Sequence, residues 1–201
     1  MVNLLAFSFT AVACLTPIAG AVPTAPTNTA RDVASAPEPF SFAKWVDEII
    51  ANPEEAATPQ QALDAYYTYV NSTASSDNVF PETASRMHKR LTCNQLLGGE
   101  APIPDAVECI NYLARLNTQK CEIYRGSSHV SFRTHGNAEM IGIRPDSNGA
   151  RRFDSNNVAR AGGKVMDACS RADNTVQGQD ATPDTAVPIA VHIIKKGWGP
   201  K

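Results

Sequence analysis

The stretch from Asp105 to Arg125, DAVECINYLARLNTQKCEIYR, joins two elements of different periodicity. Its first half has apolar residues at helical spacing: Val107, Ile110, Leu113 and Ala114. Together with Pro104 before Asp105, this spacing predicts a helix over residues 105–116. The last six residues, KCEIYR, indicate a strand. The surrounding domain is therefore expected to mix helices and strands.

The sequence on either side continues this mixture. Four further segments indicate strands: LTCNQLL (91–97), SHVSFRTHG (128–136), AEMIGIRP (138–145) and AVPIAVHIIKK (186–196). The second and third are expected to pair through a turn at residues 135–137. In the last segment apolar residues alternate, which predicts a strand whose opposite face is polar.

A second helix is predicted over SNNVARAGGKVMDACSR (155–171), with Ser155 as its cap. Gly162-Gly163 weakens this helix and allows close packing on a sheet. The order of elements predicts an α+β fold. Its expected form is a small split β-α-β sandwich, with two helices on one face of an antiparallel sheet.

Four of the five cysteines follow residue 90: Cys93, Cys109, Cys121 and Cys169. Cys14 lies in an apolar leader. An even number in an exported chain predicts two disulfides, with three possible connectivities. In the predicted sandwich the second helix ends near the start of the first, central strand. This layout favours the pairs Cys93–Cys169 and Cys109–Cys121.

The amino terminus predicts export. Residues 4–15, LLAFSFTAVACL, form an uncharged apolar run that is too short to span a bilayer. Ala19-Gly20-Ala21 follows as a small-residue cleavage site, so residues 1–21 are expected to be a signal peptide cut after Ala21. A buried N-terminal helix is the alternative. We therefore expect a secreted, extracellular protein.

Residues 22–90 are predicted to be a pro-segment. Residues 22–39 are rich in Pro, Ala and Thr and are expected to be disordered. Residues 40–70 predict two short helices that dock on the pro-segment's own partner domain. The first has Phe42, Trp45, Val46, Ile49 and Ile50 at helical spacing. The second starts at a Thr58–Gln61 capping box, and its apolar face is Leu63, Tyr66, Tyr67 and Val70. Asn71 begins a glycosylation sequon expected after this helix.

Lys89-Arg90 stands at the boundary of this pro-segment. Residues 22–90 carry five basic and nine acidic residues, whereas residues 91–201 carry thirteen basic and eleven acidic residues. An acidic pro-segment can neutralise a mildly basic domain until it is cleaved. We therefore predict cleavage by a kexin-type protease after Arg90, which releases a disulfide-stapled domain over residues 91–201. An ordinary pair of solvated charges is the alternative.

The cysteine order resembles that of a known family. Cys93 is followed by DAVECINYL (105–113), KCEIY (120–124), SNNVARAGGKVMDAC (155–169) and NTVQG (174–178). This order resembles secreted fungal effectors, the extracellular-protein effector domains also called putative necrosis-inducing factors. The resemblance covers about residues 93–194 and implies a sandwich similar to that of small fungal killer toxins, which mature by kexin cleavage. It implies a virulence or antagonism factor that binds a host or competitor protein or cell surface. It implies no catalytic residue.

An enzyme is the first alternative. The C-terminal part holds three histidines, His129, His135 and His192, with Glu122 or Glu139 and Arg133 or Arg144 as partners. Such residues supply the general acid, general base and phosphate clamp of small secreted ribonucleases. Their spacing matches no motif, and His192 is expected on the solvent face of its strand, with His129 and His135 at strand ends. A structural cell-wall protein is the second alternative.

No cofactor or metal is expected, because Cys-x-x-Cys and His-x-x-x-His spacings are missing from the sequence. Nucleic acid is not an expected partner either, because the net charge of residues 91–201 is only +2. The dibasic pairs Arg151-Arg152 and Lys195-Lys196 are interpreted as surface charges. For Trp198 two roles stay open: an exposed anchor for a partner, or a side chain packed back onto the sheet edge.

Overall fold

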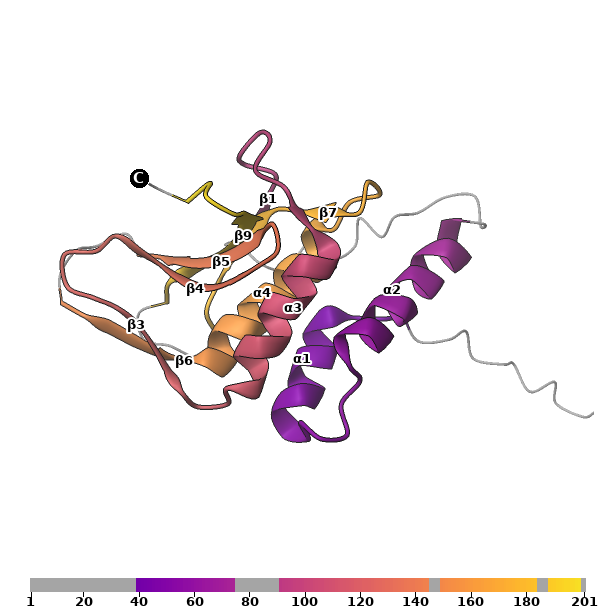
Figure 1. Cartoon of the computed structure of the whole chain (residues 1–201), viewed down its shortest axis with the longest axis horizontal. Coiled ribbons are helices and arrows are strands. Elements are labelled where there is room, and N and C mark those ends of the chain that lie inside the picture. Colours follow the sequence, from indigo (N-terminus) through magenta and orange to yellow (C-terminus); the bar gives the residue numbers. More distant parts are fainter. Residues whose placement is uncertain (1–38, 75–90, 145–148, 184–187, 200–201) are drawn as a thin grey trace, which may run out of the picture. The chain divides into compact units, whose positions relative to one another are not determined.

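The computed structural model describes residues 39–74, 91–144, 149–183 and 188–199. The signal peptide with Ala21, residues 22–38 and Lys89-Arg90 lie outside these ranges, so the expectations for them stay predictions. The described residues form an α+β fold (Figure 1). Its helices are α1 (Phe42–Ala51), α2 (Pro59–Ala74), α3 (Ile103–Arg115) and α4 (Ser155–Cys169).

Its strands pair only in antiparallel fashion. They are β1 (Thr92–Cys93), β2 (Ala101–Pro102), β3 (Lys120–Ile123), β4 (His129–His135), β5 (Ala138–Ile143), β6 (Arg151–Asp154), β7 (Thr175–Val176), β8 (Gly178–Ala181) and β9 (Ala190–Lys195). The main sheet has the order β1-β8-β9-β5-β4, and β2–β7 and β3–β6 form two ribbons.

The predicted hairpin is confirmed: β4 pairs with β5 through the turn between His135 and Ala138. The predicted central position of the first strand is wrong, because β1 lies at the edge of the main sheet. Between β1 and β9 lies β8, whose sequence GQDA has no β-branched or aromatic residue and was therefore missed. Its strand conformation comes from pairing with neighbours on both sides.

The helices α3 and α4 lie side by side against the main sheet (Figure 1). The first contacts β4 and β5, and the second contacts β8 and β9. A β-carbon at Gly162 would lie 2.7 Å from the Met140 side chain of β5 and 3.1 Å from Ile110 of α3. The buried core therefore fills the space between the two helices and one face of the sheet.

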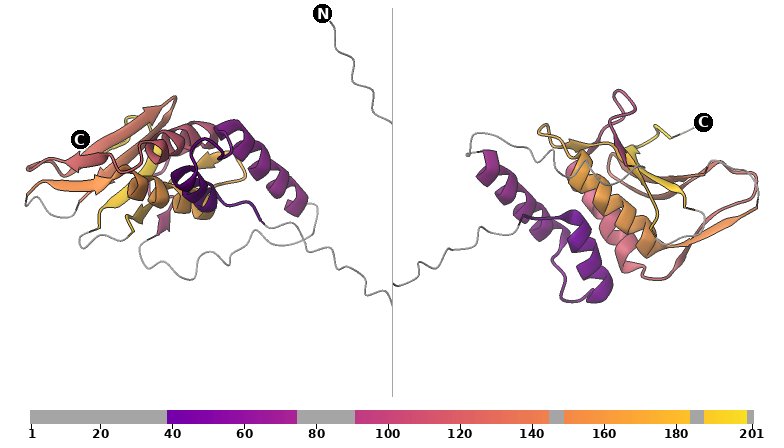
Figure 2. Two further views of the ribbon diagram at one scale, coloured as in Figure 1. Left: turned by 90° about the horizontal axis from the view of Figure 1, so that it is seen from below. Right: turned by 180° about the vertical axis from the view of Figure 1, so that it is seen from behind.

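The helix α1 packs on α4 and α3, and α2 contacts α3 (Figure 2). As the helical spacing predicts, Phe42, Trp45, Val46 and Ile49 are buried. The predicted capping box is also confirmed. The Thr58 N–H donates to Gln61 Oε1 at 2.8 Å, and the Gln61 N–H donates to Thr58 Oγ1 at 3.3 Å.

Two local predictions need correction. The sequon residue Asn71 is exposed, but it lies inside α2 and not after it, since the helix continues to Ala74. The N-cap of α4 is Asp154, and Ser155 is the first helical residue. The Ser155 hydroxyl instead donates to the carbonyl of Asn117 at 2.7 Å, which ties α4 to the loop after α3.

One of the two predicted disulfides forms. Cys93 of β1 is bonded to Cys169 at the end of α4, whereas Cys109 and Cys121 are free. The predicted Cys109–Cys121 pair is therefore wrong. The buried Cys109 thiol faces the main sheet and lies 3.8 Å from the carbonyl oxygen of Arg133. In contrast, Cys121 belongs to the β3–β6 ribbon, where it pairs with Phe153.

Candidate functional site

The candidate site is a groove on the face of the main sheet that points away from α3 and α4. Its volume is about 300 Å³. Along β5 and β9, side chains alternate between the two faces of the sheet. Met140 and Ile193 point into the core, so their neighbours Ile141, His192 and Ile194 point to the opposite face, where they line the groove.

The floor of the groove is mainly apolar. Ile194 of β9 is 1% exposed, and Ile141 of the neighbouring strand β5 is 2% exposed. The sequence predicted a polar outer face for β9, and the buried Ile194 shows that this face is partly apolar. His192 lies between two cross-strand neighbours, Ile141 on β5 and Gln179 on β8. It places a polar group at the centre of an apolar floor.

The imidazole of His192 is neutral at neutral pH. Burial lowers the pKa of His192 from 6.5 to about 4, since the charged form loses its hydration there. Among the described residues, none forms a hydrogen bond with this ring. The ring therefore retains both its donor and its acceptor nitrogen for a bound molecule.

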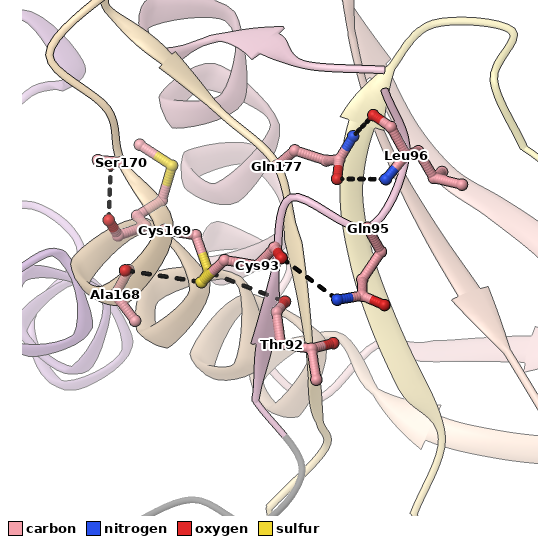
Figure 3. The surroundings of a disulfide bond; sticks show 9 residues. Thr92, Cys93, Gln95, Leu96, Ala168, Cys169, Ser170 and Gln177 are labelled. Carbon is pink, nitrogen blue, oxygen red and sulfur yellow. Dashed lines mark hydrogen bonds between the residues drawn. A yellow bond between two sulfur atoms is a disulfide. The ribbon is translucent and has the colours of Figure 1, made fainter. Parts of the chain in front are cut away.

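One wall of the groove is the loop after β1, which contributes Gln95 and Leu96. Figure 3 shows how Gln177 holds this loop: its side-chain oxygen accepts a hydrogen bond from the Leu96 N–H at 2.9 Å, and its amide nitrogen donates to the Leu96 carbonyl. The Cys93–Cys169 disulfide anchors the start of the same loop to α4. The wall is therefore fixed by hydrogen bonds to the Leu96 backbone and, just before Gln95, by the disulfide of Cys93.

The turn that follows β9 forms a second, adjoining wall. The Trp198 N–H donates to the Lys195 carbonyl at 3.1 Å, and the Gly197 N–H donates to Glu139 Oε2 at 3.0 Å. The Trp198 ring packs over Gly98, where an added β-carbon would lie 3.2 Å from it. The ring is still 44% exposed. Trp198 thus packs back against the domain and also presents one face at the rim of the groove.

The residues proposed for a ribonuclease site are not brought together. His129 and His135 lie at opposite ends of β4, roughly 20 Å apart for a seven-residue strand. His192 lies in the groove on β9. Glu122 pairs with Arg152, with a distance of 3.1 Å between Nε and Oε2. The Arg133 guanidinium stacks over the Tyr112 ring at 3.9 Å from the ring centroid.

Arg144, the other candidate phosphate clamp, has a structural role. It is 4% exposed, and its guanidinium donates to the carbonyls of Ser127, Tyr124 and Gly149. These bonds join the loop before β4 to the segment before β6. Its donors are thus used inside the protein.

No group of three metal-ligating side chains occurs among the described residues. Within the same ranges, no helix is long and apolar enough to cross a membrane.

A family described as "Domain of unknown function (DUF8794)" matches residues 88–195. The chain belongs to this family. No curated protein and no solved structure matches the chain. The DUF8794 range includes all the strands β1 to β9 of the described residues and both helices α3 and α4, together with the floor of the groove. Trp198 lies beyond it.

The helices α1 and α2 precede the DUF8794 domain and pack on its helices. The contact between α1 and α4 is close, because a β-carbon at Gly163 would lie 2.9 Å from the Ala43 α-carbon. Gly163 thus allows α4 to pack closely on α1. Its neighbour Gly162 allows the packing of α4 on the sheet that the sequence predicted. At the edge of this contact, Arg160 Nε lies 2.8 Å from Asp47 Oδ1.

Two further hydrogen bonds join this N-terminal helical pair to the DUF8794 domain. Arg115 Nη1, at the end of α3, donates to the carbonyl of Pro53 at 2.7 Å. The Tyr67 hydroxyl of α2 donates to Asn174 Oδ1 at 2.5 Å. The N-terminal helices are thus held to the domain by polar contacts as well as by the core.

Proposed function

We propose that this chain is a secreted effector or toxin-like protein that acts by binding a host or competitor target. Residues 91–201 are the active domain, and residues 22–90 are a pro-segment removed by kexin-type cleavage after Arg90. The observation that carries this proposal is the packing of α1 on α4. A short N-terminal helical pair shares one buried core with a separate family domain.

This arrangement supports a pro-segment that binds its own domain. Phe42, Trp45 and Ile49 bury their side chains against α3 and α4, and polar contacts surround them. After a cut at Arg90 these contacts would be intermolecular, so the helical pair could leave and uncover an apolar surface. The family match begins at residue 88, next to the predicted cut.

Binding is favoured over catalysis by the placement of the polar residues. The histidines lie in three separate places, and Arg133, Arg144 and Glu122 interact within the protein. The packing of α3 and α4 against one antiparallel sheet supports a split β-α-β sandwich similar to that of killer toxins.

The intact mass and N-terminal sequence of the secreted product test the processing. We expect a product that begins at Leu91. The double variant Lys89→Ala with Arg90→Ala should leave a longer product in the medium. Lys195→Ala with Lys196→Ala is the matched control, because this dibasic pair ends a paired strand and should remain uncut. A wild-type product that begins at Val22 would contradict the proposal. The same mass reports any glycan at Asn71, but only on a product that retains the pro-segment.

The activity is tested by applying the purified product to candidate target cells beside an RNA-degradation assay. A binding protein should keep its effect when His129, His135 and His192 are each changed to Gln. A ribonuclease should lose about 10²–10⁴-fold in rate at one of them. Retention in the producing cell wall with no effect on other cells would instead indicate a structural wall protein.

A further inference from the structure

We propose that the groove over β9 binds an uncharged, mainly apolar small molecule whose single hydrogen-bonding group meets His192. This inference goes beyond the proposed function, because the described residues that line the groove lie between positions 95 and 199, all after the proposed cut. Its volume of about 300 Å³ is at the lower end of the range of small-molecule sites, roughly 300–1,000 Å³.

The charge of the described lining residues indicates whether a charged or an uncharged ligand is favoured. Among the described residues that line the groove, no side chain carries a charge at neutral pH, since the one titratable group in this set is the neutral His192. A charged ligand group would lose its hydration there without gaining a partner, which is costly. An uncharged ligand has no such cost, and it gains by removing from water its own apolar surface and that of the partly exposed Leu96 and Trp198.

The polar group of the ligand is placed by His192. The ring lies on the floor between Ile141 and Gln179, and no described residue satisfies its nitrogens. A donor or acceptor on the ligand would pair with a group that is already largely desolvated. That pairing favours a ligand with one polar group over a pure hydrocarbon.

The walls are already in place without a ligand. Gln177 holds Leu96, and the turn after β9 holds Trp198. A flat apolar molecule can lie against the partly exposed Trp198 ring, as aromatic side chains prefer. Little ordering is needed on binding, which favours affinity.

The test uses the secreted protein with its disulfide intact and two fluorescent probes. N-phenyl-1-naphthylamine is uncharged and has one N–H, whereas 8-anilino-1-naphthalenesulfonate has the same rings and N–H plus a sulfonate. We expect saturable binding of the uncharged probe at one site per chain, and at least tenfold weaker binding of the sulfonate.

Two variants locate the site. His192→Phe keeps the apolar floor and removes the hydrogen bond. This change should weaken binding of the uncharged probe roughly two- to tenfold. Trp198→Ala removes one wall and should also weaken binding of the uncharged probe. Tyr124→Ala is the matched control for Trp198→Ala, because Tyr124 is an exposed aromatic residue that does not line the groove. Far-ultraviolet circular dichroism checks that each variant is folded.

Three results would overturn the inference: no saturable binding, equal binding of both probes, or unchanged affinity in both groove variants. A fourth would assign the groove to a second copy of the chain. Leu97, beside the groove wall, is 94% exposed. A dimer that excludes the probe and dissociates in Leu97→Ser would show that this side chain occupies the groove of its partner.

Discussion

The carboxylate of Asp167, in α4, accepts a hydrogen bond of 2.6 Å from the N–H of Phe42, the first residue of α1. It also accepts bonds from the Ser41 hydroxyl at 2.7 Å and the Ala43 N–H at 3.1 Å. The first N–H groups of a helix have no partner within it and carry partial positive charge. Burial raises the pKa of Asp167, and these three hydrogen bonds oppose that rise. One side chain of the DUF8794 domain thus caps the helix that precedes the domain.

Asp167→Ala should therefore weaken the packing of α1. We expect the free energy of unfolding to fall by about 1–2 kcal/mol, as for other lost N-cap interactions. Urea denaturation of the uncleaved chain, which retains α1, followed by the fluorescence of the buried Trp45 measures this change. Asp47→Ala is the matched control, since it removes only the exposed ion pair with Arg160 and should cost less than about 1 kcal/mol. Equal losses in the two variants would contradict the capping role.

Gly163→Ala and Gly162→Ala should differ, although the residues are neighbours. The new methyl group at position 163 would meet the backbone of Ala43 at 2.9 Å, and overpacking of this kind costs about 1–3 kcal/mol. At position 162 it would meet the flexible end of Met140, which can move. Alanine also favours the helix by up to about 1 kcal/mol. Thermal unfolding should show a lower midpoint for Gly163→Ala and an unchanged or higher midpoint for Gly162→Ala. A lower midpoint for Gly162→Ala than for Gly163→Ala would show that α1 does not pack closely against Gly163.

Thiol titration should find two free thiols in the unreduced protein after denaturation. In the native state both should react slowly. Burial raises the pKa of Cys109 to about 12 and also raises the pKa of Cys121, so little thiolate forms at pH 8. The double variant Cys109→Ala with Cys121→Ala should have no titratable thiol after denaturation. A denatured protein with no free thiol would instead indicate a Cys109–Cys121 crosslink.

Acid should destabilise the protein through His192. Its pKa is about 4 in the folded state and 6.5 in the unfolded chain, so the unfolded chain binds the extra proton. The stability that depends on the neutral ring is present above pH 6.5 and is lost as the pH falls toward 4. The neighbours that face the ring, Ile141 and Gln179, are uncharged, and the carboxylate on this face of β5, Glu139, accepts a bond from Gly197.

Urea midpoints measured between pH 7 and pH 4 test this dependence. His192→Gln should flatten the part of the profile between pH 6.5 and 4, because glutamine binds no proton there. His135→Gln is the control, since His135 is exposed at the end of β4, and it should keep the wild-type profile. A His192→Gln profile with the wild-type slope would show that another group causes the acid sensitivity.

Local sequence patterns determined most of the regular structure. The spacing of Phe42, Trp45 and Ile49 and the Thr58–Gln61 capping box predicted α1 and the start of α2. The apolar stripes of α3 and α4 and the β4–β5 hairpin were also predictable. In each case the interacting residues are within a few positions of one another in the chain, so the sequence alone brings them together.

Only the tertiary structure decided the position of β8, the cysteine pairing and the groove. The sequence GQDA forms a strand because β1 and β9 pair with it, and neither partner is a sequence neighbour. Four cysteines allow three connectivities, and the free pair results from the placement of Cys109 against β4 and Cys121 in the β3–β6 ribbon. The groove needs Leu96, His192 and Trp198 together, and Leu96 and Trp198 are 102 positions apart. Such contacts depend on how distant segments pack, and hydrophobic spacing within one segment carries no information about its distant neighbours.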